Sequence, residues 1–93
     1  MLPAEELSRA RTMAERGETF FKLGEYEKAI TEYKGAYLLL KTPMILINIG
    51  QCYRALGQYE EAKHHYEAYL REDPEGPYAE EDRKSTRLNS SHT

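Results

Sequence analysis

The apolar residues between positions 25 and 40 recur at the spacing of one helical face. They are Tyr26, Ala29, Ile30, Tyr33, Ala36, Tyr37 and Leu40. Steps of three and four residues place apolar side chains on one side of an α-helix. A similar stripe crosses residues 59–70, where Lys63 interrupts it at the position that Ile30 holds in the first. The pattern as a whole predicts helices over about residues 4–23, 26–40, 44–56 and 59–72, and hence an all-α fold.

The two halves of this pattern are copies of each other. Sliding the sequence by 33 positions superposes Gly17 on Gly50, Gly24 on Gly57, and Tyr33 on Tyr66. Each copy contains two helical stripes joined by Leu-Gly-x-Tyr, whose glycine can adopt the left-handed conformation that ends a helix. Proline cannot continue a helix, so Lys41-Thr42-Pro43 separates the copies and Asp73-Pro74 closes the second. A period of this length is typical of stacked helical repeats.

The residues in register resemble the tetratricopeptide repeat, a helix-turn-helix unit of about 34 residues. The first copy carries matching residues at Met13, Gly17, Phe20, Gly24, Tyr26, Ala29, Tyr33 and Ala36. The second carries them at Leu46, Ile49, Gly50, Tyr53, Gly57, Tyr59, Ala62, Tyr66 and Pro74. The resemblance implies an α–α superhelix with four main helices plus a partial C-terminal helix, in which the aromatic residues fill spaces within and between units. Arg16 stands where the family usually has leucine, which predicts a less buried outer edge.

The repeat also divides the chain into segments. We expect an extension of the first helix over 1–9, unit 1 over 10–42, unit 2 over 43–76, a partial capping helix over 77–84, and a disordered or non-native tail over 85–93. About three units are normally needed to bury the faces of such repeats. The chain is therefore expected to be a fragment of a larger repeat protein. Residues 48–54 are similar to bacterial repeat proteins, which favours a bacterial type.

Composition narrows the possible partners. The 13 Lys and Arg residues are outnumbered by 16 Asp and Glu, for a net charge of −3, which argues against a nucleic-acid partner because phosphate binding needs a basic surface. No apolar run approaches the roughly 20 residues of a membrane span. The first residues lack the basic and apolar stretches of a signal peptide. A weak preference for the cytoplasm follows, with the compartment left open.

The chain offers no combination of residues expected for catalysis, cofactor binding or metal binding. His64 and His65 are adjacent, so on a helix they point about 100° apart and do not share one ion. A zinc site needs three or four ligands, and none is in register. We expect these histidines on a solvated face with Glu–His pairing. Cys52 has no neighbouring base and is expected to be a buried packing residue. The sequence therefore predicts a protein that is not an enzyme.

The resemblance implies a binding surface instead. In tetratricopeptide arrays the first helix of each unit lines a concave groove that receives a peptide or a partner helix. The positions carried over to this chain are Arg11, Ala14, Glu18, Phe21, Lys22, Met44, Ile47, Gln51, Arg54 and Ala55. Their mixture of apolar and cationic side chains suits a protein partner that is partly apolar and carries some negative charge. An alternative is that Phe21, Met44 and Ile47 pack against another unit or each other.

Other roles stay open at this point. The exposed repeat faces could form a structural scaffold or a homo-oligomer, and the module could regulate an enzyme encoded beyond this chain. Arrays that clamp a terminal carboxylate have Lys and Asn where this chain has Ala14 and Glu18, so that specificity is disfavoured.

Overall fold

The computed structural model describes residues 3–75, which form four α-helices. These are α1 (Ala4–Lys22), α2 (Tyr26–Leu39), α3 (Pro43–Ala55) and α4 (Tyr59–Glu72). Both ends of all four helices agree with the sequence-based expectation to within one residue, and no strand occurs in residues 3–75. The all-α fold is thus confirmed. The expected capping helix at 77–84 and the tail at 85–93 lie outside the described residues.

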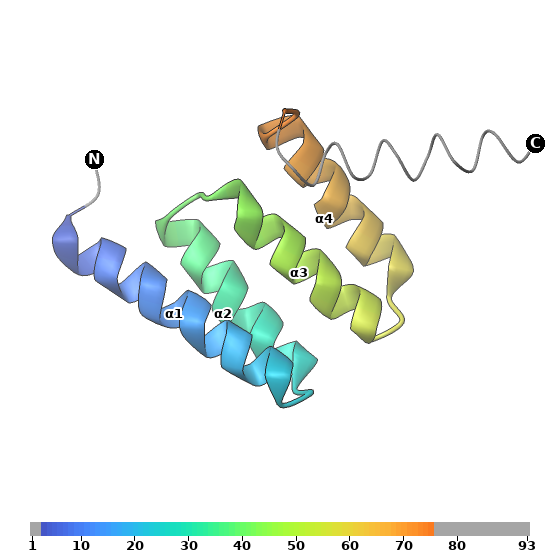
Figure 1. Cartoon of the computed structure of the whole chain (residues 1–93), viewed down its shortest axis with the longest axis horizontal. Helices are drawn as coiled ribbons and strands as arrows, with labels where there is room; N and C mark the ends of the chain where they lie inside the picture. The colour runs from blue at the N-terminus through green and yellow to red at the C-terminus, as the bar shows by residue number, and fades with distance from the viewer. Residues whose placement is uncertain (1–2, 76–93) are drawn as a thin grey trace, which may run out of the picture.

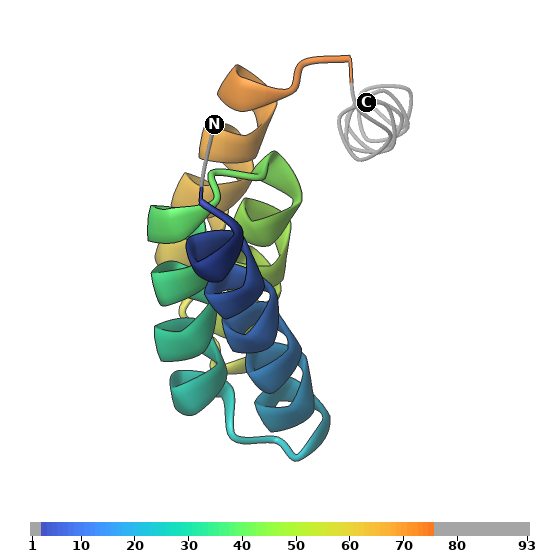
Figure 2. The same cartoon turned by 90° about the vertical axis from the view of Figure 1, so that its left-hand side faces the viewer.

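The helices follow one another as two antiparallel hairpins that stack side by side (Figure 1). Each helix packs on the next one along the chain: α1 on α2, α2 on α3, and α3 on α4. In the turned view, the first helices of the hairpins, α1 and α3, lie toward the right, and α2 lies toward the left (Figure 2). The stack therefore exposes one side formed by first helices and another formed by second helices.

The two hairpin turns have the same backbone conformation. Gly24 and Gly57 both have φ of 79°, in the left-handed region that favours glycine. After each glycine, the next residue returns a hydrogen bond to the last turn of the preceding helix: Glu25 N–H donates to Phe20 O at 2.9 Å, and Gln58 N–H donates to Tyr53 O at 2.9 Å. This is the Schellman arrangement that ends a helix. The repeated Leu-Gly-x-Tyr sequence thus sets both turns, as predicted.

The main hydrophobic core joins the two hairpins. It consists of α2 and α3 side chains: Ala29, Ile30, Tyr33, Ala36, Ile45, Ile49 and Cys52. Full burial of a large apolar side chain contributes about 1.5–3 kcal/mol, so this interface makes the two units one cooperative structure. Cys52 is fully buried, as predicted. A smaller cluster of Leu46, Ile47 and Tyr69 joins α3 to α4.

Each hairpin is closed by a tyrosine ring that lies against a glycine. A Cβ atom on Gly17 would stand 2.8 Å from Cδ1 of Tyr33, and one on Gly50 would stand 2.7 Å from Cε1 of Tyr66. Real Cβ atoms do not approach a ring that closely, so both positions need glycine for the helices to pack at this spacing. The equivalent contacts explain why glycine and tyrosine recur together at the 33-residue offset.

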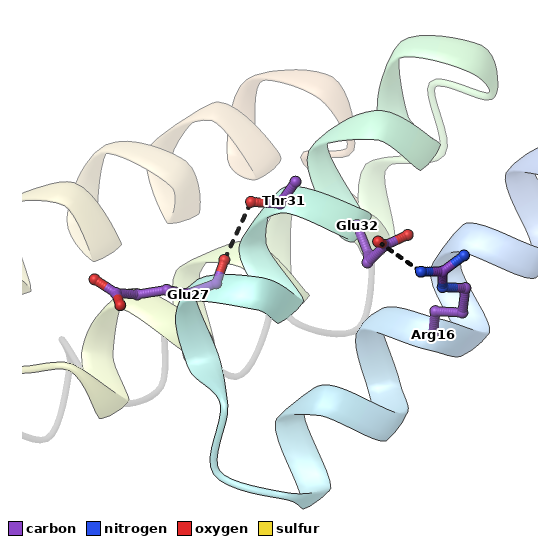
Figure 3. A network of polar contacts seen from close by, with 4 residues as sticks. All are labelled: Arg16, Glu27, Thr31 and Glu32. Atoms are coloured by element: carbon purple, nitrogen blue, oxygen red, sulfur yellow. Dashed lines mark hydrogen bonds and ion pairs between the residues drawn. The ribbon is translucent and has the colours of Figure 1, made fainter.

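Side chains at the outer edges of the stack are more exposed than those at its centre. Arg16 on α1 is exposed, as its departure from the family pattern predicted, and its Nη2 lies 3.5 Å from Oε2 of Glu32 (Figure 3). Beside this pair on α2, the Thr31 hydroxyl donates to the Glu27 carbonyl at 3.3 Å (Figure 3). Arg16 is exposed and Glu32 half-buried, and an ion pair at the protein surface contributes about 1 kcal/mol at most.

At the opposite edge of the stack, the exposure of Tyr59 differs from the sequence-based expectation. Tyr59 was expected to fill a space within or between units, yet it is 67% exposed. Its counterpart Tyr26 is half-buried, with its ring edge-on to Phe21 at a centroid distance of 5.2 Å. The difference arises because α4 is the last helix of the described part of the chain, and because Arg54 takes the place of Phe21.

The buried core makes stability sensitive to alkaline pH. Burial raises the pKa of Tyr33 from 10.0 to about 12 and that of Cys52 from 9.0 to about 11. The unfolded chain therefore releases these protons at lower pH than the folded chain does. The contribution of each group to the free energy of unfolding is complete below the pKa of the group in the unfolded chain. It is lost as pH rises through the pKa of the group in the folded chain.

We accordingly expect constant stability up to pH about 8.5, and a loss on the order of 1–2 kcal/mol per group by pH about 11. Urea denaturation followed by circular dichroism at pH 8, 9.5 and 11 measures it. In the double variant Tyr33→Phe with Cys52→Ala, the free energy of unfolding should fall much less as pH rises. An equal fall in the parent and the double variant would show that neither Tyr33 nor Cys52 causes the loss of stability at alkaline pH.

Candidate functional site

The exposed candidate residues come from the first helix of each hairpin. On α1, Ala10 and Gly17 are buried, whereas Arg11, Glu18 and Lys22 lie exposed on another face of the same helix. The 33-residue repeat places an equivalent set on α3, where Met44, Gln51 and Ala55 are exposed. Six of the ten candidates thus line corresponding faces of α1 and α3. Lys22 Nζ lies 4.0 Å from Oε1 of Glu18, an exposed pair that leaves Arg11 as the other cation on the α1 face.

Two further candidates are only partly accessible. Ala14 and Phe21 are half-buried and pack against the core that joins the hairpins. Phe21 also makes its ring contact with Tyr26. Part of each side chain is therefore accessible on α1, and the rest is buried against the core.

Ile47 does not belong to the accessible surface. It is 5% exposed and packs with Leu46 and Tyr69 in the contact between α3 and α4. Of the two interpretations offered by the sequence, packing is therefore the one that holds for Ile47. The position lies on the same helical face as Ala14, but a bulky isoleucine reaches α4 where alanine would not.

Arg54 lies at the open edge of the stack. It is exposed and interacts with the Tyr66 hydroxyl. Burial raises the pKa of Tyr66 above its usual value, and the Arg54 charge partly offsets that increase. A hollow of about 370 Å³ opens here, lined by Arg54, Tyr59, Ala62, Lys63, Tyr66, Glu67 and Leu70. Arg54 thus lies between the exposed face of α3 and the outer face of α4.

His64 is exposed as expected, whereas His65 differs from the sequence-based expectation. His65 is half-buried, its ring stacks against Tyr53 at a centroid distance of 5.2 Å, and its Nδ1 lies 2.9 Å from the Glu61 carbonyl oxygen. A carbonyl only accepts, so Nδ1 carries the proton in this contact. The predicted pairing with a glutamate carboxylate is replaced by a backbone bond, because the i−4 carbonyl is within reach of the ring. Within residues 3–75 no three His, Cys, Asp or Glu side chains are grouped to hold a metal ion.

Sequence reasoning missed a second hollow, of about 580 Å³, between α2 and α4. Its walls come from two helices that are far apart in sequence, and α3 provides its base. The available signal was a polar residue on each of the two second helices, Lys34 and His65. Neither belongs to the family signature, and their separation along the sequence does not indicate that they share a site. None of the helices in the described part is long and apolar enough to cross a membrane.

The sequence matches the model of a known protein family. The family model described as tetratricopeptide repeat matches residues 8–71, more than half of the chain. The chain belongs to the tetratricopeptide repeat family, as the resemblance implied. Proteins of this family are generally non-catalytic protein–protein interaction modules. A search of curated proteins finds no match to the chain.

Proposed function

We propose that this protein binds a peptide or a partner helix across the exposed faces of α1 and α3. The observation that carries the proposal is the equivalence of these faces: the 33-residue repeat presents Arg11, Glu18 and Lys22 in parallel with Met44, Gln51 and Ala55, all of them exposed. Such a ladder of matching positions suits an elongated ligand that lies across both units. Membership of the tetratricopeptide family supports a protein partner.

The chemistry of the surface defines the partner further. Met44 is 39% exposed and adaptable in shape, and it offers an apolar contact at the N-terminal end of α3. Arg11 and Arg54 bring cations to the same helices. A ligand with an apolar side chain flanked by carboxylates would satisfy both kinds of contact.

Peptide selection tests the proposal. Dodecamer peptides are selected from a random display library on the immobilised full chain, and the affinity of the best peptide is measured by fluorescence anisotropy. Arg11→Glu is expected to weaken binding about tenfold, because a contact made by a charged group is worth about 1.5–3 kcal/mol. Arg54→Glu should weaken it similarly without unfolding the protein.

Arg9→Glu is the matched control. Arg9 is also exposed on α1, but two residues from Arg11 and thus on another side of the helix. It is expected to change affinity less than about twofold. Equal effects of Arg9→Glu and Arg11→Glu, or no effect of either, would rule out this face as the binding surface.

We also propose that the chain is part of a longer array of repeats. Support comes from the outer face of α4, where the exposed Tyr59 and the hollow beside Arg54 occupy positions that α3 covers in the first unit. Self-association through the same face is the competing role. Sedimentation velocity at two concentrations separates them, since a concentration-independent monomer excludes the homo-oligomer.

A further inference from the structure

The cleft between α2 and α4 has the features of a second binding site. It has a volume of about 580 Å³ and is lined by residues of α2, α3 and α4, without any from α1. It therefore lies apart from the α1 and α3 faces of the proposed peptide surface. We propose that this cleft binds an acidic amphipathic helix of a partner protein.

The base of the cleft is apolar. Leu46 and Ile49 of α3 form it, and they are 6% and 2% exposed. Ala68 of α4 adds a small side chain to one wall, and Leu38 of α2 stands at the rim with 75% of its surface exposed. A large apolar side chain entering between the two helices would cover Leu38 and contact the base. Removing that apolar area from water favours binding.

The walls of the cleft bring cations to this apolar base. Lys34 of α2 is held in place by Tyr53: its Nζ lies 2.9 Å from the Tyr53 hydroxyl oxygen and 5.5 Å from the centre of the ring. Arg71 of α4 also lines the cleft. Within residues 3–75, neither Lys34 nor Arg71 forms an ion pair. Both charges are therefore available to a ligand.

The acidic residue in the cleft is already hydrogen-bonded. Glu72 Oε1 accepts a hydrogen bond from the Tyr37 hydroxyl at 2.9 Å. Burial, and after it this contact, raises the pKa of Tyr37. The fixed charges of the lining, Lys34, Arg71 and Glu72, sum to +1, whereas the whole chain carries −3. This local reversal of sign selects an acidic ligand and disfavours a basic one.

The shape of the cleft favours a helix over a small molecule. A small ligand is held by burial of most of its surface, which an open trough with an exposed rim does not provide. A trough between two helices with an apolar base is instead the site in which a third helix lays its apolar face. Its carboxylates would then flank the apolar stripe and meet Lys34 on one side and Arg71 on the other.

Three matched peptides test the proposal. The first is an acetylated, amidated 18-residue helix with leucine along one stripe and glutamate and alanine elsewhere. The second replaces every leucine by serine, and the third replaces every glutamate by lysine. Fluorescein-labelled peptides are titrated with the full chain, and amide shifts of the ¹⁵N-labelled chain locate the contact.

The first peptide is expected to bind saturably, with the largest shifts at Leu38, Ala68 and Arg71. The serine and lysine peptides should bind at least about tenfold more weakly. Saturable binding of the lysine peptide with equal affinity would overturn the proposal, as would the absence of saturable binding by the first peptide.

Variants of the chain complete the test. Lys34→Glu and Arg71→Glu are each expected to weaken the first peptide about tenfold, and Leu38→Ser about threefold, since one apolar contact of this size is lost. Lys63→Glu is the control, because Lys63 lies exposed on α4 outside the cleft. Leu38 is so exposed that its variant keeps the fold. Shifts confined to Arg11, Glu18 and Gln51 would contradict the cleft site while supporting the α1 and α3 surface.

Discussion

Replacing Tyr33 by alanine is expected to lower the free energy of unfolding by about 3–5 kcal/mol. The side chain is 5% exposed and belongs to the core that joins the hairpins. Its ring also lies against Gly17, so truncation removes contacts within the first hairpin and between the two. The surrounding helices cannot close over a space of that size, and the loss approaches the total stability of a small domain.

Urea denaturation followed at 222 nm measures this loss. Tyr59→Ala is the matched control, because Tyr59 is 67% exposed on α4 and should cost less than about 0.5 kcal/mol. Tyr33→Phe, which keeps the ring, should fall between the two. If Tyr33→Ala unfolded at the same urea concentration as Tyr59→Ala, the ring would not be the central packing element of the stack.

The two helix-contact glycines are expected to differ in their tolerance of a side chain. Gly17→Leu should cost about 3 kcal/mol and Gly50→Leu about 1 kcal/mol, both within the range for overpacking. A new Cβ atom meets a tyrosine ring in both cases, Tyr33 for Gly17 and Tyr66 for Gly50. Tyr33 is buried between the hairpins and has no room to move, whereas Tyr66 is half-buried beside an open hollow and can swing outward.

Thermal melts of the two variants and of Glu15→Leu make the comparison. Glu15 is exposed on α1, so a leucine there adds the same side chain without a clash and should leave the melting temperature within about 2 °C. Equal losses at Gly17 and Gly50 would show that the outer ring is held as firmly as the inner one. Melts indistinguishable from the parent would refute the helix contact at both positions.

Most of the fold could be predicted from the sequence because each local signal agreed with the repeat. The apolar stripes fixed the four helices, the glycines of Leu-Gly-x-Tyr fixed both turns, and Pro43 fixed the start of α3. Cys52 was predicted to be buried because cysteine is among the residue types most often buried and no neighbouring base supports a reactive role, and it is fully buried. Agreement between propensity, pattern and turn chemistry is what makes a repeat predictable.

The errors arose where the environment depends on side chains from elsewhere in the fold. Tyr59 has the same repeat position as Tyr26, but what covers that position is a following helix, which periodicity within one unit does not describe. Ile47 looked available because its helical face is that of Ala14, yet its larger side chain reaches Tyr69. The cleft between α2 and α4 needs three helices in place before Lys34 and Arg71 share one site.

Two helical hairpins stack into one structure through side chains of α2 and α3. Methyl-to-methyl nuclear Overhauser effects in the ¹³C-labelled chain measure this contact directly. Cross-peaks are expected from Ile30 and Ala36 on α2 to Ile45 and Ile49 on α3, because all four belong to the same buried cluster. Helical chemical shifts in both hairpins without any cross-peak between α2 and α3 would contradict the account.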